Sequence, residues 1–111
     1  MFSAVANRIN TLNIQIGEFA IDAQVFRYGY AALNIQLDKK GTRLKFIDTP
    51  SCYGGKGLEG YIIGASESNL DFSKTGFNSD DWRSCFYGNT VTTVDELVAI
   101  VIDIIAKITV N

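Results

Sequence analysis

The strongest constraint on the fold is a regular alternation of apolar and polar residues on both sides of one short turn. Residues 33–37 read Leu-Asn-Ile-Gln-Leu and residues 43–46 read Arg-Leu-Lys-Phe, with Lys39-Lys40-Gly41 between them. Successive side chains of a strand point to opposite faces, so this pattern predicts an antiparallel hairpin with one apolar and one basic face. Gly41 suits the left-handed position of its turn.

Both ends of the chain predict helices. Apolar residues recur at helical spacing over residues 2–12, which indicates an amphipathic helix of about three turns. Thr93 followed by Glu96 is a capping box, in which each side chain pairs with the other residue's backbone amide. The segment from Val94 to Ile108 is apolar over most of its circumference. We expect a helix there in spite of its many β-branched residues.

Alternating patterns predict further strands near residues 14–23, 25–30, 61–63 and 82–87, with Gly17 marking a bulge or a break. Residues 66–81 are expected to form loops and turns. A chain of 111 residues is expected to form one domain. The order of elements predicts an α+β domain over residues 1–111. We expect a mostly antiparallel sheet of about four to six strands, with the N-terminal and C-terminal helices packed on one face.

Composition narrows the classes of function. The chain contains no histidine, which excludes Ser-His-Asp and Cys-His catalysis and His-ligated zinc within it. A net charge of -2 argues against nucleic-acid binding. Cys52 and Cys85 do not form a disulfide framework, residues 1–8 lack the pattern of a signal peptide, and no apolar run is long enough to span a membrane. We therefore expect a cytoplasmic protein without membrane, metal or cofactor.

The charges are unevenly distributed along the chain. Residues 1–56 have a net charge of +3 and residues 57–111 a net charge of -5. Four cations on the wet face of the predicted hairpin are candidates for contact with a phosphate backbone or an acidic protein: Lys39, Lys40, Arg43 and Lys45. The favoured interpretation is that they provide solubility and protect the sheet edge.

Residues 50–90 combine aromatic rings with glycine, serine and asparagine, a composition typical of recognition loops. The candidate ligand-binding residues in this region are Tyr53, Lys56, Trp82, Arg83 and Tyr87. The segment Gly55–Gly60 has the G-x-G-x-x-G spacing of a dinucleotide-binding loop, but a strand rather than a helix is expected after it. We expect a connection between two strands, with an anion cradle as the alternative.

Three classes of function remain open, and no motif is specific enough to name a family. The favoured one is a non-catalytic interaction protein that forms a homo-oligomer, preferably a dimer, through Ile100, Ile102 and Ile105 of the apolar C-terminal helix. The alternative is a module that binds a small molecule or an anion in the 50–90 region. An enzyme using carboxylates such as Glu59 or a thiol ranks last, because no poised acid–base pair is visible.

Overall fold

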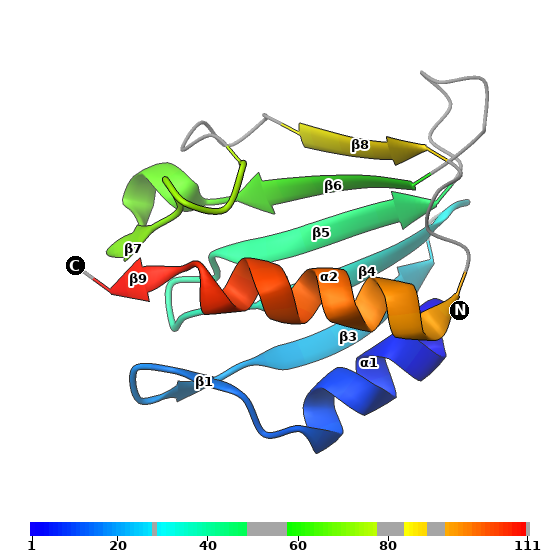
Figure 1. Cartoon of the computed structure of the whole chain (residues 1–111), viewed down its shortest axis with the longest axis horizontal. Helices are drawn as coiled ribbons and strands as arrows, with labels where there is room; N and C mark the ends of the chain where they lie inside the picture. Colours follow the sequence, from blue (N-terminus) through cyan, green and yellow to red (C-terminus); the bar gives the residue numbers. More distant parts are fainter. Residues whose placement is uncertain (28, 49–57, 78–83, 89–92, 111) are drawn as a thin grey trace.

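The computed structural model describes residues 1–27, 29–48, 58–77, 84–88 and 93–110 (Figure 1). Between its two helices the chain runs back and forth through a sheet. The elements are, in chain order, α1 (Phe2–Thr11), β1 (Gln15–Ile16), β2 (Phe19–Ala20), β3 (Asp22–Arg27), β4 (Ala31–Gln36), β5 (Arg43–Asp48), β6 (Leu58–Ile63), η2 (Ala65–Glu67), β7 (Leu70–Asp71), β8 (Ser84–Gly88), α2 (Val94–Ala106) and β9 (Thr109–Val110).

The main sheet has five strands in the order β3-β4-β5-β6-β8, and every neighbouring pair is antiparallel. Two small two-stranded sheets, β1-β2 and β7-β9, accompany it. The chain therefore has the predicted α+β fold with a mostly antiparallel sheet. The short strands β7 and β9 were not predicted, because two-residue strands carry too little alternation to be recognised in a sequence.

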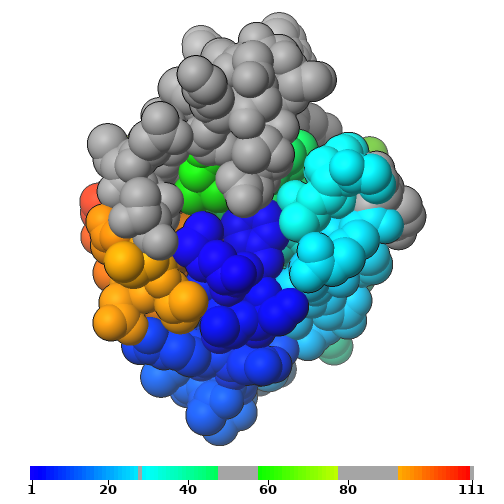
Figure 2. All heavy atoms as spheres, turned by 90° about the vertical axis from the view of Figure 1, so that its right-hand side faces the viewer, coloured from blue at the N-terminus to red at the C-terminus, as the bar shows by residue number. Residues whose placement is uncertain are grey.

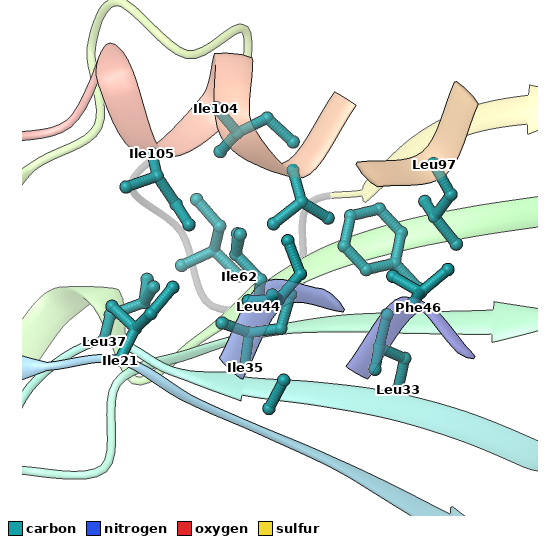
Figure 3. Packing of buried hydrophobic residues seen from close by; sticks show 14 of the residues in the cluster. Ile21, Leu33, Ile35, Leu37, Leu44, Phe46, Ile62, Leu97, Ile104 and Ile105 are labelled. Atoms are coloured by element: carbon teal, nitrogen blue, oxygen red, sulfur yellow. The ribbon is translucent and has the colours of Figure 1, made fainter. Parts of the chain in front are cut away.

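Both helices pack on one face of the sheet, where they enclose the hydrophobic core (Figure 3). The space-filling view shows α1, in blue, beside the start of α2, in orange (Figure 2). The inward residues of β4 and β5, such as Leu33 and Phe46, meet α2 through Leu97 and Ile104. The core residues with no exposed surface are Val5, Ile9, Leu33, Ile35, Leu37, Leu44, Phe46, Ile62, Leu97 and Val101. No helix among the described residues is both long and apolar enough to cross a lipid bilayer.

Local signals in the sequence correspond to local structure. The Thr93 hydroxyl accepts a hydrogen bond from the Glu96 amide at 3.1 Å, and the Glu96 carboxylate accepts one from the Thr93 amide, which confirms the capping box. Gly17, with φ of +61°, forms the turn between β1 and β2, so it marks a break rather than a bulge. Gly41 takes the expected left-handed conformation, with φ of +88°.

The outer edge of β3 is partly closed by a side chain from α1. The Asn10 amide donates to the Ala23 carbonyl at 2.9 Å and accepts from the Ala23 amide at 2.8 Å. Asn10 thus occupies two backbone groups that a further strand would otherwise use. This pair of bonds ties the last turn of α1 to the sheet.

Candidate functional site

The face of the sheet opposite the helices is organised in rows of side chains that run across the strands. Residues paired in an antiparallel ladder lie on the same face, so the register assigns each row directly. The first row is Asp22, Gln36, Arg43 and Ile63. The second is Gln24, Asn34, Lys45 and Tyr61, and the third is Phe26, Ala32, Ile47 and Glu59. We call this surface the open face.

The open face carries a groove of about 380 Å³ over β3, β4 and β5. Its described lining consists of alternate residues from the three strands and one turn glycine: Asp22, Gln24, Phe26, Asn34, Gln36, Gly41, Arg43 and Lys45. The volume lies at the lower end of the range for small-molecule sites. A polar floor of this kind is formed because the same alternation that buries Leu33, Ile35 and Leu44 directs their neighbours outward.

Two cations occupy the β5 side of the groove. Arg43 and Lys45 are half-buried, and the ion pairs among the described residues, Arg8–Asp95 and Lys107–Asp103, include neither of them. The Lys45 ammonium lies 5.6 Å from the centre of the Tyr30 ring, a cation–π contact. The Arg43 guanidinium donates to the Gly41 carbonyl at 3.3 Å. Both cations are held in position by uncharged partners.

Three side-chain amides occupy the β3 and β4 side. Gln24 donates to Asp22 Oδ2 at 2.8 Å, and Gln36 donates to the Asp38 carbonyl at 2.9 Å. Each bond uses one N–H of the amide, so each glutamine keeps its carbonyl oxygen as an acceptor and one further N–H as a donor. Asn34, at the centre of the second row, makes no side-chain hydrogen bond to another described residue.

The turn beside the groove is fixed by Asp38. Its Oδ1 accepts from the Lys40 and Thr42 amides at 2.9 and 3.0 Å, and its Oδ2 accepts from the Ser68 hydroxyl at 2.8 Å. Burial acts to raise the pKa of Asp38, but the hydrogen bonds from Thr42, Ser68 and Lys40 outweigh it and hold the pKa below its ordinary value. The β4–β5 turn is thereby attached to the segment that follows β6.

Glu59 lies on the same face, in the row that begins with Phe26. It is only 2% exposed, and its Oε2 is the buried side-chain oxygen without a hydrogen-bond partner among the described residues. Of the other carboxylates in the loop region, Glu67 is exposed in η2 and Asp71 lies in β7, while Asp80 and Asp81 lie outside the described residues. No group of three metal-ligating side chains occurs among the described residues.

Most of the predicted ligand-binding residues fall outside the described part of the chain. Tyr53, Lys56, Trp82 and Arg83 are not described, and Tyr87 is described only as a backbone position in β8. The predicted site at residues 50–90 therefore stays a prediction. Leu58–Ile63 forms β6, so a strand follows the glycine-rich segment where a dinucleotide-binding loop needs a helix.

The three isoleucines predicted as an oligomer interface have different surroundings. Ile105 is 7% exposed and belongs to the core, and Ile100 is half-buried against that core. Ile102 is 39% exposed on the outer side of α2. Only Ile102 therefore presents a large apolar side chain on the outside of this helix.

Comparisons with known proteins leave the site to be interpreted from its own chemistry. No protein-family model, no curated protein and no solved structure matches the chain. The function of the chain is therefore inferred from the geometry of the open face.

Proposed function

We propose that the protein is a non-catalytic binding module whose open-face groove takes up a small anionic ligand. The proposal rests on one observation: Arg43 and Lys45 face the groove half-buried, and no described carboxylate forms an ion pair with either. An anion would receive charge-assisted hydrogen bonds from groups that are already positioned. From the sequence, anion binding in the 50–90 region is an alternative function. We keep that function but assign the site to β3, β4 and β5.

Binding without catalysis fits the chemistry of the groove. Asp22 is the one carboxylate in its described lining, which contains no serine, threonine or cysteine. Acid–base or nucleophilic catalysis needs a second poised group within hydrogen-bonding distance of the first. The lining instead supplies groups that can bind and orient a ligand. The proposal also includes a cytoplasmic location, where the ligand would be a small acidic metabolite.

Calorimetric titration at low ionic strength tests this function. Citrate and inorganic phosphate serve as probes, with wild type compared with the Arg43→Gln/Lys45→Gln double variant. Each lost charge-assisted hydrogen bond costs about 1.5–3 kcal/mol, so affinity should fall at least about tenfold. Lys74→Gln is the control, because Lys74 is an exposed cation outside the groove lining and its loss should leave affinity unchanged. Equal binding by the double variant, or no binding of any small anion to wild type, would refute the proposal.

A second candidate is self-association through α2, as expected from the sequence. Ile102 is exposed, and Ala99 and Ala106 are exposed at helical spacing on either side of it. Sedimentation equilibrium at micromolar concentrations should then show a dimer that Ile102→Lys converts to a monomer. A monomeric wild type under the same conditions would remove this candidate without affecting the groove.

A further inference from the structure

The side of the groove formed by β3 and β4 differs in chemistry from the side formed by β5. On β3 and β4, Asp22 contributes a carboxylate and the bonded Gln24 and Gln36 present amide carbonyl oxygens, all of which accept hydrogen bonds. On β5, Arg43 and Lys45 present only donors and positive charge. The carboxylate and amide oxygens, with one remaining N–H of each glutamine, therefore line one side of the groove, and the cationic donors line the other.

The two sides are separated by a distance that one small ligand can bridge. Asp22, Gln36 and Arg43 lie in one row on three neighbouring strands. With strands about 4.8 Å apart, the outer two backbones are about 10 Å from each other. Side chains from both strands reach into this space, so a single small molecule can contact both sides at once.

We infer that the ligand is a small hydroxylated anion, with the chemistry of a sugar acid or a sugar phosphate. This inference rests on the proposed function and specifies its ligand. The anionic group would bind Arg43 and Lys45, and hydroxyl groups at the other end would donate to Asp22 and the glutamine carbonyls. Asn34 lies between the two sides and carries both a donor and an acceptor, which matches a hydroxyl that gives and receives a hydrogen bond.

Competing ligand classes use less of the groove. An inorganic anion would satisfy Arg43 and Lys45 but leave the acceptors of β3 and β4 unused. A neutral sugar would satisfy the acceptors but leave the cations without a counter-charge. Phe26 also lines the groove and gives the carbon–hydrogen face of a ring an apolar surface on which to pack. A hydroxylated anion is the class that engages all three kinds of group.

Titration of the full chain with four probes tests the inference. Calorimetry compares D-glucuronate, D-glucose 6-phosphate, D-glucose and inorganic phosphate in the same low-salt buffer. At least one of the hydroxylated anions should bind about tenfold or more tightly than either D-glucose or inorganic phosphate, because it makes both sets of contacts. A preference between glucuronate and glucose 6-phosphate distinguishes a carboxylate from a phosphate as the anionic group.

The Asn34→Ala variant provides an independent arm. It should weaken binding of the preferred hydroxylated anion about fivefold to tenfold and leave inorganic phosphate unchanged, because only a hydroxyl-bearing ligand reaches Asn34. Asn69→Ala is the matched control, since Asn69 is exposed and lies outside the groove lining. Equal urea midpoints for the two variants would establish that Asn34→Ala is folded.

The failures of the two proposals are distinguishable. If inorganic phosphate binds as tightly as both hydroxylated anions, and Arg43→Gln/Lys45→Gln abolishes both kinds of binding, the inference is overturned and the proposed function stands. If none of the charged probes binds, both are overturned. Tighter binding of D-glucose than of any anion would also contradict both, because it would make the cations irrelevant.

Discussion

Removing the Asp38 carboxylate should destabilise the protein by about 3 kcal/mol. The carboxylate accepts three hydrogen bonds, from the Lys40 amide, the Thr42 amide and the Ser68 hydroxyl. Bonds to a charged acceptor contribute about 1.5–3 kcal/mol each when buried, and we take about 1 kcal/mol each because Asp38 is half-exposed to water. Asp38→Ala removes all three, and Thr42, which is 1% exposed, loses the partner of its amide.

Equilibrium unfolding in urea measures this change, with Glu67→Ala as a control at an exposed carboxylate of η2. The difference between wild type and Asp38→Ala should also depend on pH. The pKa of Asp38 is lower in the folded protein, so its stabilisation is fully present above the unfolded pKa, about 4, and is lost as the pH falls through the folded pKa. The difference should therefore shrink as the pH falls below about 4. A difference below about 0.5 kcal/mol at neutral pH, or one that grows on acidification, would refute this reasoning.

Substitutions at three further positions test other parts of the fold by the same urea assay. Gly64→Ala should cost about 1–2 kcal/mol, because φ is +82° there, although the added Cβ would make only an ordinary contact with the Thr42 Cα at 3.5 Å. An unchanged urea midpoint would contradict this. Thr93→Ala should lower the free energy of unfolding by about 1 kcal/mol, because it removes the hydroxyl of the capping box. Thr93→Ser keeps a hydroxyl and should therefore retain most of that stability. Asn10→Leu should cost about 1–3 kcal/mol, because it frees the Ala23 amide and carbonyl at the edge of β3. The freed edge should also promote aggregation, which light scattering measures. A soluble variant of unchanged stability would count against this role of Asn10.

The fold was predictable where the sequence carries a regular period or a specific local motif. The alternation over residues 33–46 predicted the β4–β5 hairpin and its basic outer face, and the capping box predicted the start of α2. The shortest strands carried no such signal. Residues 66–81 are expected from the sequence to form only loops and turns, but η2 ends within them and β7 lies wholly within them. The strand β7 forms because it pairs with β9, a distant segment that no local pattern reveals.

The groove was harder to predict because it depends on strand order. The sequence places Arg43 and Lys45 on a basic hairpin face, for which a role in solubility is the expected one. What distinguishes them is their neighbours: Asn34 and Gln24 share a row with Lys45 only because β3 pairs with β4 in this register. The alternation over residues 33–37 does indicate that Asn34 and Gln36 point away from the core. No local pattern, however, reveals which strands pair with this one on either side.

The most direct test of the open-face groove is a chemical-shift map of the ¹⁵N-labelled protein titrated in turn with D-glucose 6-phosphate and D-glucuronate. We expect progressive shifts at the side-chain amides of Gln24, Asn34 and Gln36, at Arg43 Nε and at the backbone of β5, with α2 unaffected. Shifts confined to α2, or no shifts with either ligand at millimolar concentration, would contradict binding in the groove.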